Sequence, residues 1–355
     1  MRWDGAQNAK AEVFRRAFGY AAAGAGPDGV PAFLPCPDSA VGERVARGRR
    51  EGLRAAADLI AVGVSAMPGD PRQVVLALVL QHHRLRDHPI VLRARQIAGA
   101  TECALVVAGP AVPPGAADPG THRPLRLGAP VGRADAPPGS LGFFATCRAS
   151  GARGFVSTNH ALADANAGAP GDPILHLGAA AAPGEARQGA HQGARQGARQ
   201  VARLRRFRAI DGAAGGINTV DGAFAELIEG IACQPHRIGE PLDAPGDPGA
   251  LLERGMAVVK VGPATERTAG TVAVVRLDNL TTTLRAGGFA RFDGQVAVRG
   301  GAARFAAPGD GGALVATRTG RPVGLLHAVT TGGLAYASPI RDVLDALDVD
   351  LHARP

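Results

Sequence analysis

Short apolar runs separated by glycine, proline and aspartate turns fill the chain from residue 140 onward, and this spacing constrains the fold most. The 355 residues include 50 Gly and 27 Pro and few aromatic side chains. Such a composition favours turns and short strands over long helices. The spacing predicts a mainly β fold built as one closed antiparallel barrel or a pair of barrels. The predicted strands are residues 141–146, 154–157, 173–177, 201–210, 223–229, 257–261, 271–277, 295–299, 313–316 and 323–329.

Helical and β-type patterns alternate before residue 113. Charged and small apolar residues at helical spacing predict a helix over about residues 40–57. Two β-type runs, residues 59–65 and 73–80, flank a Pro- and Gly-rich turn and predict a hairpin. Residues 103–108 predict a further strand.

These patterns divide the chain into three parts. We expect residues 1–112 to form a small α+β leader domain. Residues 113–139 are dense in turn formers, which predicts a linker. Residues 140–355 would hold the barrels and end in an amphipathic helix over 338–347, with Ser338 as its cap and Pro339 at its first position.

Positive charge is concentrated in one stretch. The formal net charge is +8, and seven arginines lie between Arg187 and Arg208, with no acidic residue after Glu185 in that stretch. Residues 186–203 repeat Ala-Arg-Gln-Gly, within an Arg-, Gln- and Gly-rich insertion at about 179–203. Each glycine costs about 1 kcal/mol inside a helix, so we expect a mobile surface loop there. A nucleic-acid-binding scaffold that uses Arg187 to Arg208 is the alternative function, although arginine excess also fits a GC-rich genome.

The remaining composition points to a soluble cytoplasmic protein without a metal or cofactor. Four cysteines lie far apart and form no CxxC pair, which predicts reduced structural thiols. No apolar run approaches the roughly 20 residues of a membrane span, and the first residues lack the apolar core of a signal peptide. The cysteines are Cys36, Cys103, Cys147 and Cys233.

Acyl transfer from a peptide needs a base, a carboxylate that orients it, a nucleophile, and backbone donors for the oxyanion. His160 follows an apolar run and is the candidate base. Asp221 precedes an alternating apolar run and is the favoured carboxylate, with Asp211 as its rival. A histidine at a strand end is more often structural, and an aspartate there often only closes a turn. The order of base, carboxylate and Gly-Asp-x-Gly turn favours the catalytic interpretation.

The turn at residues 304–316 lacks a nucleophile. Its glycines would allow the amides of Gly309 and Gly311 to point into an oxyanion site. No Ser, Thr or Cys lies within two residues of Gly311, the position where the serine would stand.

Residues from about 125 to 350 resemble the trypsin-like (chymotrypsin-fold) serine peptidases, in particular the bacterial group related to the plant narrow-leaf proteins. Residues 97–107 (IAGATECALVV) resemble the leader domain of that group more loosely. The segments that carry the main resemblance are 141–144 (LGFF), 157–163 (STNHALA), 171–175 (GDPIL), 218–223 (NTVDGA), 258–272, 308–315 (PGDGGALV) and 320–327 (GRPVGLLH).

The resemblance implies two six-stranded barrels with the site in the cleft between them. It assigns His160 as general base, Asp221 as its orienter and Gly311 to the nucleophile position. It places Phe305 near the floor of the specificity pocket, which argues against preference for Arg or Lys. It also assigns His327 to the specificity pocket, although a histidine there departs from the family pattern, close to where Asp221 would lie.

We therefore expect an inactive pseudo-peptidase that still binds a peptide or protein ligand in its cleft. If position 311 is serine in a parent protein, the same chain would be an active endopeptidase. The basic scaffold remains the alternative from a different functional class.

Overall fold

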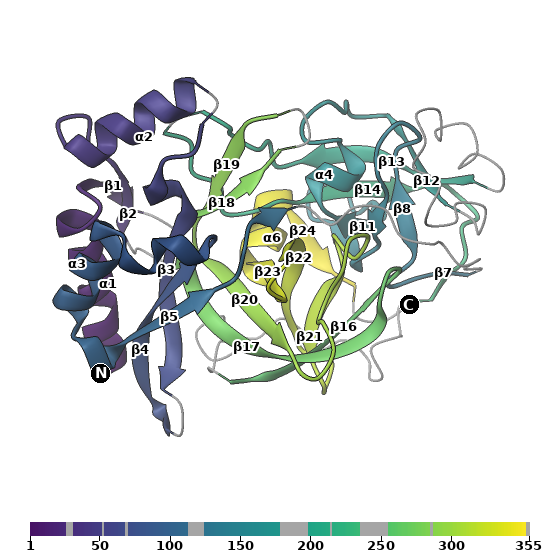
Figure 1. The fold of residues 1–355 in the computed structure, drawn as a ribbon. Coiled ribbons are helices and arrows are strands. Elements are labelled where there is room, and N and C mark those ends of the chain that lie inside the picture. Colours follow the sequence, from purple (N-terminus) through teal and green to yellow (C-terminus); the bar gives the residue numbers. More distant parts are fainter. Residues whose placement is uncertain are drawn as a thin grey trace.

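The computed structural model describes residues 1–25, 31–51, 53–67, 70–112, 124–177, 198–213, 215–234, 255–284 and 287–352. Two β units lie side by side, and an N-terminal unit of helices and strands lies against one of them (Figure 1). No helix in these ranges is both long enough and apolar enough to span a bilayer.

Six strands near the C-terminus form a closed antiparallel barrel. Each strand pairs with the next one around the ring, and β21 pairs back to β16, so that the ring closes. Closure leaves none of the six as a free edge. In order around the ring, the strands are β16 (Ala257–Gly262), β17 (Glu266–Asp278), β20 (Gln295–Gly300), β23 (Leu334–Pro339), β22 (Pro322–Thr330) and β21 (Leu314–Thr317).

The second β unit is a curled open sheet. Its order is β24, β10, β11, β14, β13, β12, β8, β9, and no pairing among the described residues joins its two ends. The strand spacing left one or two barrels open and the resemblance predicted two, and the described pairings close only one of them. The strands are β24 (Val349–Leu351), β10 (Phe143–Cys147), β11 (Arg153–Ser157), β14 (Ala223–Leu227), β13 (Arg199–Phe207), β12 (Pro173–His176), β8 (Pro130–Gly132) and β9 (Gly139–Ser140).

The C-terminal helix α6 (Ile340–Leu347) packs onto the core of the open sheet. The predicted apolar face is confirmed, because Ile340, Val343, Leu344 and Leu347 are buried. The predicted cap is wrong: Pro339 is the N-cap, and the Ser338 hydroxyl instead donates to Gln295 Oε1 at 3.2 Å.

The N-terminal unit continues the sheet of the closed barrel. The predicted hairpin is confirmed as β3 and β4, and β3 pairs with β17. The predicted helix over 40–57 is shorter, because α2 ends at Arg50. The elements are α1 (Trp3–Arg16), β1 (Tyr20–Ala25), β2 (Pro31–Pro35), α2 (Ala40–Arg50), η2 (Ala56–Leu59), β3 (Ile60–Met67), β4 (Asp70–Leu80), η3 (His83–Asp87), α3 (Pro89–Ala98), η4 (Ala100–Glu102) and β5 (Cys103–Val107).

Several short strands connect these units. Part of the stretch predicted as a linker is β8, which pairs with β12 inside the open sheet. β6 follows the N-terminal unit in the chain and pairs with both β18 and β22. The chain therefore passes from the N-terminal unit directly to a strand that pairs with the closed barrel. The remaining strands are β6 (Ala111–Val112), β7 (Leu125–Arg126), β15 (Cys233–Gln234), β18 (Leu280–Thr283) and β19 (Phe289–Phe292).

Candidate active site

His160 and Asp221 come together at the same end of two paired strands. His160 lies in the short helix α4 (Asn159–Leu162), directly after β11, and Asp221 lies just before β14. In the β11 to β14 ladder Ser157 is opposite Ala223. Because the pairing is antiparallel, the residue after one strand meets the residue before the other. His160 Nδ1 is 2.6 Å from Asp221 Oδ2.

Three further hydrogen bonds fix the Asp221 residue. Its Oδ1 accepts from the backbone amides of Asn159 at 2.7 Å and His160 at 3.3 Å. Its own amide donates to Ser338 Oγ at 3.3 Å. Burial acts to raise the pKa of Asp221, but the charge and hydrogen bond of His160 outweigh it, so the pKa lies below its ordinary value.

An ionised Asp221 decides which nitrogen of His160 carries the proton. The carboxylate can only accept, so Nδ1 donates to it and Nε2 is left as the basic nitrogen. Thr158 Oγ1 lies 3.4 Å from that Nε2. Thr158 is fully buried, whereas the His160 side chain is 13% exposed. The imidazole is thus oriented and reachable from solvent.

The rival carboxylate lies elsewhere. Asp211 is exposed, and its Oδ1 accepts from the Ala213 amide at 2.8 Å within the same turn. The structure therefore brings Asp221, and not Asp211, to the histidine.

The glycine turn contains two residues whose backbone conformation requires glycine. Gly309 has φ +102° and Gly312 has φ +89°, both in the region that favours glycine. Gly311 is not among the residues with positive φ. Its φ therefore does not require glycine. The Gly312 amide donates to Leu326 O at 2.7 Å, whereas no hydrogen bond within the described part of the chain uses the amides of Gly309 or Gly311.

Gly139 joins this turn to the helix of His160. A methyl group added at Gly139 would lie 2.6 Å from Ala161 Cβ and 2.6 Å from Gly311 O. The next amide, of Ser140, donates to that same Gly311 oxygen at 2.5 Å. Gly139, in β9, therefore lies directly between the glycine turn and Ala161, the residue after His160.

A buried ion pair supports the turn from inside the closed barrel. Lys260 Nζ lies 2.8 Å from Asp310 Oδ2, and both side chains are completely buried. Asp310 also accepts from the hydroxyl of Thr265 at 2.7 Å and from the amides of Ala264 and Ala307. Sequence reasoning missed Lys260. The signal was its rarity, because Lys10 and Lys260 are the only lysines in the chain.

Burial and Asp310 act on Lys260 in opposite directions. Desolvation lowers the pKa of Lys260, and the charge and hydrogen bond of Asp310 oppose that shift. Removal of either partner would therefore leave the other as an unpaired buried charge.

The two residues assigned to the specificity pocket are both buried. Phe305 is fully buried in the core of the closed barrel, and its carbonyl accepts from Thr268 Oγ1 at 2.6 Å. His327 is 2% exposed, and its ring centroid lies 4.9 Å from that of Phe292. Burial lowers the pKa of His327 to about 4, against the opposing effect of the Asp221 charge.

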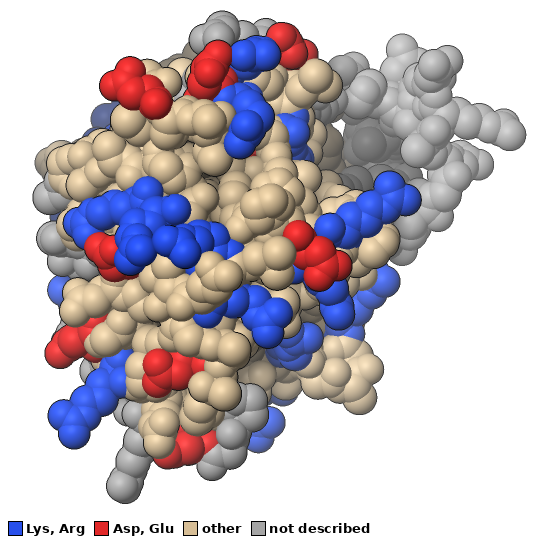
Figure 2. Space-filling model, turned by 60° about the vertical axis from the view of Figure 1, so that its left-hand side comes forward, with Lys and Arg blue, Asp and Glu red and all other residues tan. Residues whose placement is uncertain are grey.

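The described part of the basic segment is largely engaged within the fold. Residues 178–197, which hold most of the predicted loop and repeat, lie outside the described residues. Beyond them, Arg203 donates to Gly171 O, Arg206 pairs with Asp348, and Arg205 lies 3.7 Å from Glu226. On the face drawn in Figure 2, basic side chains form several separate groups with acidic side chains between them. Nucleic-acid binding through this segment stays a prediction.

The structure brings together a histidine, a carboxylate that orients it and a glycine turn, without a hydroxyl or thiol at position 311. The described ranges contain no group of three or more His, Cys, Asp or Glu side chains suited to a metal ion. A histidine that a carboxylate orients can accept and donate a proton.

Comparisons with known proteins give structural matches alone. No protein-family model matches the chain, and no curated protein matches its sequence. The structure is similar to that of Thermobifida fusca protease A, with 16% identity, a TM-score of 0.42, and coverage of 65% of this chain and 99% of the protease. A glutamic acid specific serine protease with a histidine triad in substrate binding has 17% identity and a TM-score of 0.44, covering 64% and 100%. The HtrA-type protease AlgW with a tripeptide has 14% identity and a TM-score of 0.35, covering 61% and 57%.

These matches describe a partial likeness to chymotrypsin-fold serine proteases at low identity. The function proposed below stands on the geometry of the site.

Proposed function

We propose that the chain is a trypsin-like peptidase domain that has lost its nucleophile and holds an extended peptide in the cleft between its two β units. The observation that carries the proposal is the His160 to Asp221 pair, 2.6 Å apart, beside a glycine turn with no side chain at position 311. We assign the fold to the two-barrel arrangement of that family, with the open sheet as its less regular half. The N-terminal unit is proposed as its leader domain, and the protein as cytoplasmic.

The backbone at Gly311 supports a loss of the side chain rather than a redesigned loop. Gly309 and Gly312 need glycine because their φ angles are positive, but Gly311 does not. A serine at position 311 is compatible with this backbone. Without it no acyl-enzyme forms, and removal of a serine nucleophile lowers kcat on the order of a millionfold.

The remaining parts suit binding of a peptide carbonyl. The amides of Gly309 and Gly311 are the proposed donors to that carbonyl. A peptide added as a strand would gain main-chain hydrogen bonds without needing a nucleophile. His160, reachable from solvent, would lie beside the bound peptide bond.

The test of the lost nucleophile is Gly311→Ser, assayed by fluorophosphonate labelling and by cleavage of a fluorogenic casein. We expect labelling and cleavage in the serine variant and neither in the natural chain. Gly311→Ala is the matched control for adding a side chain, and Gly311→Ser with His160→Ala should abolish both signals. An inert but folded Gly311→Ser variant would contradict the proposal.

The test of peptide binding is hydrogen exchange of the natural chain with and without a tryptic digest of casein. We expect slower exchange in residues 158–162 and 309–313, and no change in helix α3. Equal exchange in all three segments at millimolar peptide would rule out the proposed binding.

A further inference from the structure

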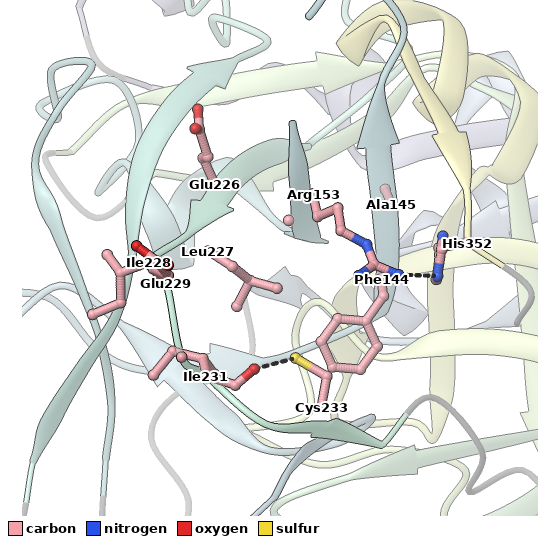
Figure 3. A pocket seen from close by; sticks show the side chains of 12 residues that line it. Phe144, Ala145, Arg153, Glu226, Leu227, Ile228, Glu229, Ile231, Cys233 and His352 are labelled. Atoms are coloured by element: carbon pink, nitrogen blue, oxygen red, sulfur yellow. Dashed lines mark hydrogen bonds between the residues drawn. The ribbon is translucent and has the colours of Figure 1, made fainter. Parts of the chain in front are cut away.

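A pocket of about 520 Å³ lies against the open sheet, away from His160 and Asp221. Strands β10, β11 and β14, the segment that follows β14, and His352 after β24 form its walls (Figure 3). The volume falls within the range of roughly 300–1,000 Å³ in which proteins bind small molecules.

Apolar side chains occupy the middle of this pocket. Phe144 is 4% exposed, and Leu227 and Ile231 are half-buried against the core of the open sheet. In Figure 3 these three side chains point into the same space. An aliphatic ligand covering them would remove apolar surface from water.

One end of the pocket carries a positive charge without a carboxylate partner. Arg153 Nη2 lies 3.2 Å from His352 Nε2, and no ion pair within the described part of the chain joins Arg153 to an acidic side chain. Burial, reinforced by the Arg153 charge, lowers the pKa of His352. A neutral imidazole accepts a hydrogen bond but adds no negative charge, so the guanidinium charge stays uncompensated.

The acidic residues of the pocket lie on its other side. Figure 3 shows Glu229 on the far side of Leu227 from Arg153 and His352, whereas Glu226 points away from the apolar side chains. Glu226 lies 3.7 Å from Arg205, which partly compensates it. A second negative group on a ligand would meet these carboxylates, which limits the ligand to one charged end.

We propose that this pocket binds a small monocarboxylate. Its carboxylate would lie on Arg153 and His352, because a guanidinium offers paired N–H donors to a planar carboxylate. Its aliphatic body would cover Phe144, Leu227 and Ile231.

The pocket is independent of the proposed peptidase site. Arg153 begins β11 and Leu227 ends β14, whereas His160 follows β11 and Asp221 precedes β14. The two sites therefore lie at opposite ends of the same paired strands, and a ligand in one leaves the other open.

The experiment is calorimetric titration of the full chain with octanoate, octanol and octylamine, which share one chain length and differ in charge. We expect octanoate to bind at least tenfold more tightly than the other two. Arg153→Gln should lose about tenfold in octanoate affinity, and Arg153→Lys less. Arg321→Gln, an exposed arginine of the closed barrel, is the matched control and should bind as the natural chain does.

A second measurement locates the ligand. Cys233 lines the pocket, whereas the half-buried Cys36 lies in the N-terminal unit. Octanoate should slow iodoacetamide modification of Cys233, measured by peptide mass spectrometry, and leave Cys36 unchanged. Equal affinity for the three probes, no binding, or binding without protection of Cys233 would each overturn the proposal.

A third pair of probes separates a free acid from the end of a peptide. N-acetyl-Gly-Gly-Leu is compared as its carboxylate and as its amide. Binding of the carboxylate form alone extends the ligand class to peptide termini. Equal binding of the two forms would show that Arg153 does not distinguish the carboxylate from the amide, and would overturn the proposal.

Discussion

The half of the candidate site on the open sheet brings two polar side chains together, whereas the half on the closed barrel is a glycine turn without a side chain at position 311. His160 Nδ1 and Asp221 Oδ2 are 2.6 Å apart. The turn retains two glycines with positive φ and a supporting ion pair, but no side chain at 311.

This difference follows from what holds each half in place. The dyad is itself the interaction that orients the imidazole. The turn is held from beneath by Asp310, which Lys260, Thr265 and backbone amides fix inside the barrel. This support acts through the side chain of Asp310, so the shape of the turn does not depend on a side chain at position 311.

The largest expected effect breaks the support of the turn. Lys260→Met should lower the free energy of unfolding by about 3–5 kcal/mol, because it leaves the fully buried Asp310 charge unpaired. Urea denaturation measures the change. The double variant with Asp310→Asn, which removes the stranded charge, should recover part of the loss. A change below about 1 kcal/mol would mean that the turn does not depend on this pair.

The next effect concerns His327, which belongs to the closed barrel but lies near the dyad. Its pKa in the fold is about 4, below its ordinary value of 6.5, so the unfolded chain binds more protons between these values. Its stabilising contribution is present above pH 6.5 and is lost as pH falls toward 4. At 1.36 kcal/mol per pKa unit, the loss is about 3 kcal/mol.

The measurement for His327 is urea denaturation at several pH values between 4 and 7. His327→Gln should lose this part of the pH dependence, while the contribution of Asp221 remains in both proteins. Identical pH profiles for the two proteins would contradict the buried neutral state of His327.

A smaller effect is expected where the two halves meet. Gly139→Ala should cost about 1–3 kcal/mol, because the added methyl group would lie 2.6 Å from both Ala161 Cβ and Gly311 O. In the Gly311→Ser background it should also lower the rate of fluorophosphonate labelling. Gly301→Ala, where a methyl group would meet nothing within 4 Å, is the control. Equal stability of the two variants would show that the contact of Gly139 with Ala161 and Gly311 tolerates an added methyl group.

The smallest effect is expected at the surface of the open sheet. Arg148 pairs with Asp345 and Asp350, which are 62% and 70% exposed. Arg148→Ala should change the free energy of unfolding by at most about 1 kcal/mol, less at high salt. A loss near that of Lys260→Met would remove the contrast between buried and exposed pairs.

Local signals in the sequence predicted the elements that depend on neighbouring residues. The hairpin of β3 and β4, the strand β5 and the apolar face of α6 follow from turn chemistry and periodicity. Helix α1 was missed, because its buried face includes Lys10, which lies 2.5 Å from Asp278. A charged residue on that face hides the amphipathic pattern.

Contacts between distant residues were beyond the sequence. Lys260 and Asp310 are 50 positions apart, and Arg153 and His352 are 199 apart, so no spacing rule connects them. The position of His160 relative to Asp221 was anticipated from the order of motifs. The sequence did not predict which sheet closes into a barrel, because closure depends on whether the first and last strands of a sheet pair with each other.

The two lysines have a practical consequence for the chemistry of the surface. The chain has only Lys10 and Lys260, and the folded protein exposes 3% of the first and none of the second. Acylating reagents, aldehyde crosslinkers and enzymes that attach groups to lysine amines therefore find no accessible target side chain while the protein is folded. Incorporation of an acyl group at either lysine would report unfolding directly. The rate of lysine labelling would therefore measure the rate at which the native state opens.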